Sequence, residues 1–147
     1  MKITLLVVGK LKEKFLVAGV AEYLKRLRKF ATVEVKEISE CRTVDEECTK
    51  LLSLVPQNSW LCVLDIVGES LSSEDFAKKI SALNLSGVSN LTFAIGGAFG
   101  LSEEIRRAAD FRLSLSAMTL THQMTRLILT EQIYRAFKIN RHEPYHW

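Results

Sequence analysis

Gly96 and Gly97 directly follow a short apolar run, Leu91–Ile95, in the last third of this 147-residue chain. Paired glycines at the end of a strand let the backbone approach a ligand and leave its N–H and C=O groups unhindered. The pattern is neither a dinucleotide-binding G-x-G-x-x-G fingerprint after the first strand nor a phosphate-binding loop, because no Gly-Lys-Ser/Thr sequence occurs. The pair therefore indicates either a ligand site or an ordinary turn.

The segment from Ser114 to His122 places apolar residues next to small polar ones. Such a loop suits an adenine ring, whose edge would bond to the main chain while apolar side chains enclose its faces. A purely structural interpretation also fits. In that case Met118 and Leu120 would lie in the core, while Ser116 and Thr119 would cap the last helix.

The C-terminal segment Arg141–Trp147 carries two aromatic residues, two histidines and one arginine, an unusual set for a chain end. Aromatic rings and guanidinium planes stack on nucleic-acid bases, and the cations Arg126, Arg135, Lys138 and Arg141 are suited to neutralising phosphates. The alternative is a tail that only packs against a neighbouring element.

Metal and triad chemistry are not supported by the histidine and serine patterns. His142 and His146 have helical i, i+4 spacing, but Pro144 between them breaks a helix. The run His142–His146 has the letters of an H-E-x-x-H motif, but that motif binds zinc from a helix, which Pro144 interrupts, and no G-x-S-x-G elbow occurs. We therefore expect neither a metal site nor a serine hydrolase.

The elements that would position these segments alternate between strand and helix. Apolar runs predict strands at Ile3–Val8, Val33–Ile38, Trp60–Leu64, Leu91–Ile95 and Phe111–Leu115. Helical periodicity and capping residues predict helices near Leu16–Leu27, Cys41–Leu54, Ser72–Gly87, Ser102–Ala109 and Thr121–Ile139. This order favours one α/β domain over residues 1–147, with a parallel sheet flanked by helices on both faces. Ligands of such sheets bind beyond the carboxyl ends of the strands.

Composition fits a soluble globular protein. Apolar residues make up 48% and charged residues 25%, which excludes a disordered or fibrous chain. The net charge of +3 permits a nucleic-acid partner without demanding one. The odd cysteine count and the lack of any C-x-x-C pair argue against a disulfide scaffold. With no signal peptide or membrane span in the pattern, we expect a cytoplasmic protein.

Four ordered segments resemble the SPOUT methyltransferases, and within them the small enzymes that modify large-subunit ribosomal RNA. They are Phe93–Ser102, Leu113–His122, Glu131–Ala136 and Pro144–His146. The resemblance extends over the whole chain. It implies an enzyme that uses S-adenosylmethionine to methylate N3 of a pseudouridine in 23S ribosomal RNA. It also implies a homodimer and a trefoil knot in the C-terminal half, which general folding rules would not have suggested because threaded chains are rare.

The resemblance also assigns residues. The cofactor contacts that it implies are Leu64, Gly97, Leu115, Ser116, Ala117, Met118, Thr119 and Leu120. The catalytic and RNA-facing group that it implies, with Arg141 added from the charge pattern, comprises His122, Arg126, Glu131, Arg135, Arg141, Tyr145 and His146. One protomer's tail would complete the other's site. Our hypothesis is that His146 or Tyr145 positions the base and assists removal of the N3 proton, while Arg135 holds phosphate.

Two segments depart from the family pattern. Ala98 and Phe99 stand where the glycine turn usually has Pro-Glu, and His142-Glu143 stands where the tail usually has Asn-His. These departures keep a rival open: a ribosome-binding protein that has the fold without catalysis. A methyltransferase or nucleotide-binding enzyme that acts on small molecules is a second rival.

Overall fold

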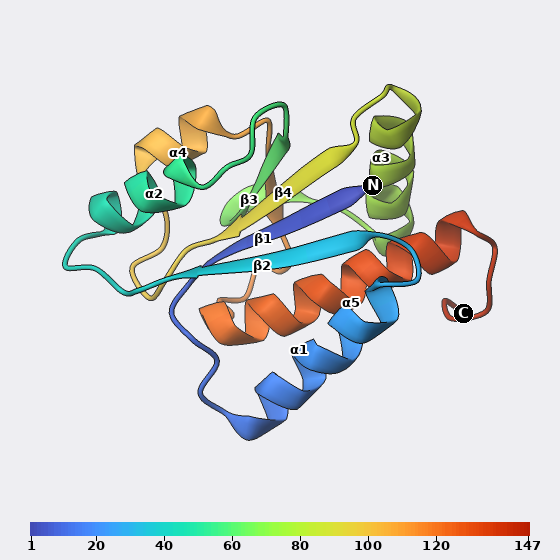
Figure 1. Ribbon diagram of the computed structural model, residues 1–147, viewed down its shortest axis with the longest axis horizontal. Helices are drawn as coiled ribbons and strands as arrows, with labels where there is room; N and C mark the ends of the chain where they lie inside the picture. Colours follow the sequence, from blue (N-terminus) through green and yellow to red (C-terminus); the bar gives the residue numbers. More distant parts are fainter.

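Five strands and five helices alternate along the chain in the computed structural model, which describes residues 1–147 (Figure 1). The strands are β1 (Lys2–Val8), β2 (Thr32–Ile38), β3 (Trp60–Ser70), β4 (Asn90–Ile95) and β5 (Phe111–Ser114). The helices are α1 (Lys14–Leu27), α2 (Val44–Ser53), α3 (Ser73–Leu85), α4 (Glu103–Ala108) and α5 (His122–Asn140). The predicted α/β alternation is confirmed.

All neighbouring strands of the sheet are parallel, in the order β2-β1-β4-β3-β5. β1 and β4 are central, and every residue from Ile3 to Val8 is buried, because helices cover both faces of the sheet. β2 is an edge strand, which explains why charged residues interrupt its apolar pattern.

Two helical layers enclose the sheet (Figure 1). Helices α1, α3 and α5 cover one face, where Leu5 and Phe93 pack with Leu129 of α5. Helices α2 and α4 cover the other face, where Leu6 and Ile105 meet. Alternate residues of β1 therefore pack in two separate apolar clusters, because successive side chains of a strand point to opposite faces of the sheet.

Side-chain caps fix where the helices begin. Thr43, Ser72, Ser102 and Thr121 each accept a hydrogen bond from the main-chain N–H three residues later. The cap at Thr43 explains why α2 starts at Val44 rather than at Cys41, as the sequence predicted. The cap at Thr121 starts α5 at His122, directly after the loop that the sequence singled out.

The third strand is longer than predicted. We expected it to end before Asp65, but β3 continues to Ser70 through an irregularity in its pairing with β5 between Leu64 and Glu69. Gly68 permits this bulge, because a Cβ atom there would lie 2.6 Å from the carbonyl oxygen of Arg112. Asp65 and Ile66 are thereby displaced from regular pairing at the carboxyl end of the sheet.

None of the helices is both long and apolar enough to span a membrane. No cluster of three or more His, Cys, Asp or Glu residues is arranged to hold a metal ion.

Candidate functional site

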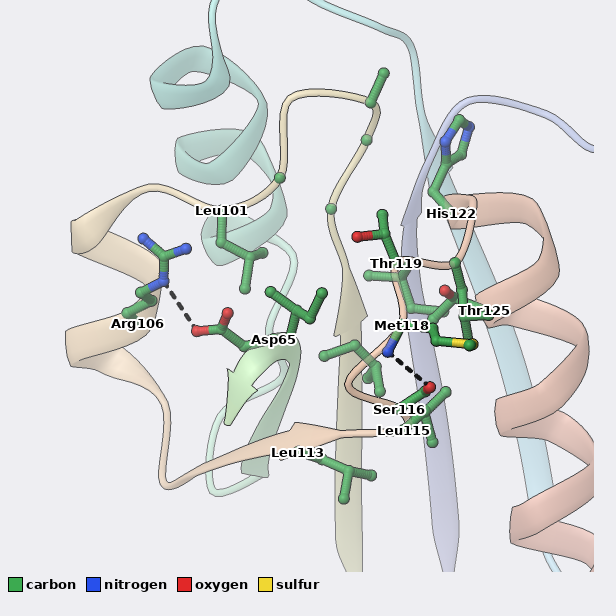
Figure 2. Close-up of a pocket in the computed structure, with 18 residues that line it drawn as sticks. Asp65, Leu101, Arg106, Leu113, Leu115, Ser116, Met118, Thr119, His122 and Thr125 are labelled. Atoms are coloured by element: carbon green, nitrogen blue, oxygen red, sulfur yellow. Dashed lines mark hydrogen bonds and ion pairs between the residues drawn. The ribbon is translucent and has the colours of Figure 1, made fainter. Parts of the chain in front are cut away.

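A cavity of about 250 Å³ opens beside the bulge of β3 and beyond the carboxyl ends of β4 and β5 (Figure 2). Its walls come from residues within segments 64–66, 95–101 and 113–120, with Arg106 of α4 and with His122 and Thr125 of α5. The three strand ends singled out from the sequence thus meet at one place, where open α/β sheets bind ligands.

Seven of the eight residues expected to contact a cofactor line this cavity: Leu64, Gly97, Leu115, Ser116, Met118, Thr119 and Leu120. The eighth, Ala117, is exposed in the same loop and is not part of the wall. The lining mixes apolar side chains with main-chain groups, which suits a small organic ligand.

The turn after β4 needs glycine for reasons of space. A Cβ atom at Gly96 would lie 2.4 Å from the carbonyl oxygen of Gly100, a distance that would force the backbone apart. Gly97 accepts a hydrogen bond from the N–H of Gly100 at 3.1 Å, and Gly100 has a φ of 81°. The glycines therefore build a tight turn whose backbone forms one wall of the cavity.

The loop after β5 leaves main-chain groups free beside the cavity. The Ser116 hydroxyl accepts from the N–H of Met118 at 3.0 Å, but Ala117, Thr119 and Leu120 make no main-chain hydrogen bond within the chain. Met118 is 78% exposed. The structural interpretation of this loop is therefore wrong, since Met118 is outside the core and Thr121 caps α5.

Asp65 forms the charged floor of the cavity. Its carboxylate is 2% exposed and accepts from Nε of Arg106 at 2.9 Å, while Nη1 of Arg112 lies 3.7 Å away (Figure 2). This hydrogen bond raises the pKa of the Arg106 guanidinium. Sequence analysis missed Arg106, because nothing in a short, polar helix indicates that one of its arginines turns toward a strand end.

A lysine-rich loop borders the start of α5. The main-chain N–H of Lys12 donates to the side chain of Gln123 at 3.0 Å, so the loop between β1 and α1 lies against the helix beside His122. The side chains of Lys10, Lys12 and Lys14 are exposed and form no ion pair. Positive charge is thus available near the cavity.

Arg126 does not occupy the RNA-facing position that we expected. Its side chain is 3% exposed, and it donates to the carbonyl oxygen of Gly9 at 2.9 Å and to the Glu37 carboxylate at 3.4 Å. Burial lowers the pKa of its guanidinium. We correct the expectation accordingly: in this arrangement Arg126 ties α5 to β1 and β2 and does not present its charge at the surface.

Arg135, Tyr145 and His146 do come together, around Glu131. The Glu131 carboxylate accepts from Nη2 of Arg135 at 2.7 Å and from the Tyr145 hydroxyl at 3.0 Å. Nη1 of Arg135 lies 3.1 Å from Nδ1 of His146, whose Nε2 lies 2.8 Å from a carboxylate oxygen of Glu74. We call Glu131, Arg135, Tyr145 and His146 the tail cluster.

Burial and neighbouring groups perturb the tail cluster electrostatically. Burial, followed by hydrogen bonds with Tyr23 and Glu131, raises the pKa of Tyr145. The hydrogen bond with His146 lowers the pKa of the Glu74 carboxyl. Tyr23 and Glu74 were not singled out from the sequence, since both lie on helices remote from the tail along the chain.

The tail cluster and the cavity lie at different ends of α5 within one chain. His122 starts this helix, and Arg135 follows thirteen residues later, which corresponds to about 20 Å along the axis. Figure 1 shows the tail folding back beyond the far end of α5. Arg141 caps that end, is exposed, and places its guanidinium carbon 4.6 Å from the ring centre of Phe30.

Comparisons with known proteins agree along the whole chain. Residues 1–146 match the family model described as "Predicted SPOUT methyltransferase". Proteins named "Ribosomal RNA large subunit methyltransferase H" from Halothermothrix orenii and Carboxydothermus hydrogenoformans are each 48% identical over 158 residues. One from Enterococcus faecalis is 43% identical. In all three pairs, 99% of both chains is covered.

Proposed function

Because this chain belongs to the SPOUT methyltransferase family, we propose that it transfers a methyl group from S-adenosylmethionine to N3 of a pseudouridine in large-subunit ribosomal RNA. The observation that carries this proposal is the similarity over 99% of the chain to proteins named as methyltransferases of that RNA. The chemistry of the cavity and of the tail cluster supports it independently.

The cavity fits the proposed cofactor. Free main-chain groups at Thr119 and Leu120 match the edge of an adenine, and Leu115 and Leu120 supply apolar contact for its faces. The turn at Gly97 offers backbone without a side chain in the way. We propose that these residues, with Leu64, Ser116, Ala117 and Met118, hold S-adenosylmethionine, whose sulfonium carries an already activated methyl group.

The tail cluster supplies the acid–base and positioning groups of the proposed reaction. N3 of the base gains a methyl group and loses its proton, and His146 is suited to assist that loss. The Tyr145 phenol, whose pKa the fold raises further, is protonated at neutral pH. On turning from Glu131 to the base, its hydroxyl would act as the hydrogen-bond donor that orients the base. Arg135, fixed by Glu131, holds an RNA phosphate.

A homodimer would account for the position of these groups. A cavity and a tail cluster about 20 Å apart on one helix cannot act on one base within a single chain. We propose that the tail of one protomer reaches the cavity of its partner, so that two equal composite sites form around a twofold axis. Residues 1–147 form one domain in this proposal, and family membership underlies the proposed trefoil knot in the C-terminal half.

The RNA partner is favoured by positive charge on both sides of the composite site. Lys10 and Lys12 lie in the loop that contacts Gln123 near the cavity, Lys14 begins α1, and Arg141 is exposed beside the tail. With His122 at the cavity rim, these residues would contact the RNA backbone around the target nucleotide. We propose a cytoplasmic location, because ribosomal RNA is the proposed substrate.

The direct test combines genetics with a purified reaction. Mass spectrometry of 23S ribosomal RNA from cells without this gene should show one methyl group missing from one pseudouridine, and the purified protein with S-adenosylmethionine should restore it on ribosomes. Unchanged RNA would contradict the proposal. Calorimetric titration separates the rivals: a protein without catalysis would not bind the cofactor, and an enzyme for small molecules would methylate free nucleosides.

A further inference from the structure

Glu47 on α2 has a buried carboxylate oxygen without a hydrogen-bond partner. The residue is 2% exposed, and its Oε1 contacts no donor, whereas Oε2 accepts only from the main-chain N–H of Cys41 at 3.2 Å. Buried polar atoms of this kind are rare, and each calls for an explanation. Only one other buried side-chain atom, Nε of Arg126, is unpartnered in the chain.

The unpartnered oxygen lies directly behind the cavity wall. A Cβ atom at Gly97 would be 3.1 Å from Oε1 of Glu47 and 3.0 Å from Cγ1 of Val8. Gly97 itself lines the cavity, whereas Glu47 does not. The backbone of one glycine therefore separates the Glu47 carboxylate from the cavity, and α2 lies beside this turn (Figure 2).

No cation of the protein neutralises Glu47. The other acid at this site, Asp65, pairs with Arg106 and Arg112, but Glu47 forms no ion pair. The positive groups nearest to its carboxyl are the Cys41 N–H, which donates to Oε2, and the N-terminal end of the α2 dipole. A buried, uncompensated carboxylate projects a negative potential through the low-dielectric wall into the cavity.

We propose that Glu47 is a specificity-determining residue that biases the cavity toward the cationic methyl donor and against its neutral product. This inference rests on the proposed cofactor. Methyl transfer converts the sulfonium of S-adenosylmethionine into the thioether of S-adenosylhomocysteine, so the donor carries one more positive charge than the product. The negative potential of Glu47 attracts the cationic donor. Once the methyl group has been transferred, the product has no sulfonium charge for Glu47 to attract, so the product is released more readily and replaced by fresh donor.

The test compares two affinities in the same protein. Calorimetric titration gives the Kd of S-adenosylmethionine and of S-adenosylhomocysteine for the wild type, Glu47→Gln and Glu47→Asp. We expect Glu47→Gln to lower the preference for the donor by about fivefold, since the charge is lost at nearly constant shape. Glu47→Asp keeps the charge and should keep the preference, even if both affinities fall. Glu46→Gln, exposed on the same turn of α2, is the matched control and should change neither value.

If the role of Glu47 were merely structural, Glu47→Gln would weaken the binding of both ligands equally. An unchanged ratio of the two Kd values in Glu47→Gln would therefore overturn the proposal. If the wild type binds neither ligand, the proposed function fails instead. If Glu47→Gln does not fold, a donor analogue with an amine cation in place of the sulfonium provides the second measurement. It should bind the wild type more tightly than the product does, and equal or weaker binding contradicts the inference.

Discussion

Arg126 and Gly9 are joined by a 2.9 Å hydrogen bond from Nη2 of the arginine to the glycine carbonyl oxygen, across 117 positions of the chain. The bond fixes the first turns of α5 against the end of β1. Since His122 and Thr125 of those turns line the cavity, Arg126 acts on the site through the position of the helix.

Replacing Arg126 should therefore affect stability and not RNA contact. Arg126→Met removes the donor to the Gly9 carbonyl and to the partly exposed Glu37, and we expect the free energy of unfolding to fall by about 2 kcal/mol. Urea denaturation measures this loss. RNA affinity of the folded variant should match that of the wild type.

The exposed Arg141 serves as the control for Arg126. Arg141→Met should lower the free energy of unfolding by less than about 1 kcal/mol, because exposed charges contribute little, and it should weaken RNA binding at low salt. If Arg126→Met instead weakens RNA binding without a loss of stability, the structural role assigned to Arg126 is wrong.

Tyr145 should make stability depend on alkaline pH. The fold raises the pKa of its phenol above the ordinary value of 10.0, so the unfolded chain ionises first as pH rises. The contribution of this shift is complete below about pH 10 and is lost above it. The stability advantage of the wild type over Tyr145→Phe should thus be constant from pH 7 to 9 and shrink at higher pH.

The same shift predicts the rate profile. A phenol that keeps its proton cannot act as the base at neutral pH, so Tyr145→Phe should lower turnover without removing the pH dependence of the rate. Disappearance of a titrating step from the pH profile of Tyr145→Phe would contradict the donor role.

Gly96→Ala should disrupt the cavity wall. The added Cβ would meet the Gly100 carbonyl oxygen at 2.4 Å, and relief of this clash should cost about 3 kcal/mol of unfolding free energy and abolish cofactor binding. Gly87→Ala is the control, because its φ of 92° is unfavourable for alanine but nothing lies within 4 Å. It should cost about 1 kcal/mol and leave cofactor affinity unchanged. Equal cofactor affinity in both variants would argue against a binding role for the glycine turn.

The alternation of elements was predictable because each strand is a short apolar run closed by a polar or glycine residue. The extension of β3 was not, because Ile66 and Val67 are exposed and their path depends on the space that Gly68 leaves beside Arg112. Local patterns predict where a strand begins more reliably than how its pairing continues around a bulge.

Some residues of the site were likewise predictable from the local sequence, whereas others depend on tertiary contacts. The loop from Leu115 to Leu120 was found because its composition differs from that of the core, and it does line the cavity apart from Ala117. Glu47 and Arg106 were missed, since each resembles its neighbours on a charged helix and becomes distinctive only through a tertiary contact. The burial of Arg126 likewise depends on a carbonyl group far away in sequence.

Two inactive variants should restore activity when they share a dimer. Thr119→Trp fills the cavity from an exposed loop position, and the double variant Arg135→Ala/His146→Ala removes the tail groups. If each site combines one protomer's cavity with its partner's tail, a mixed dimer contains one intact site. Random pairing of equal amounts should yield about a quarter of the wild-type activity.

Co-expression with two affinity tags allows the mixed dimer to be isolated, and methylation of ribosomes measures its activity. The control pairs a chain that carries all three substitutions with the double variant. No intact tail then exists in the dimer, so no activity should return. Recovery in the first pairing alone requires that tail and cavity come from different chains. An inactive mixed dimer would mean that the tail serves its own protomer, and α5 would then have to bend or the tail unfold to cover about 20 Å.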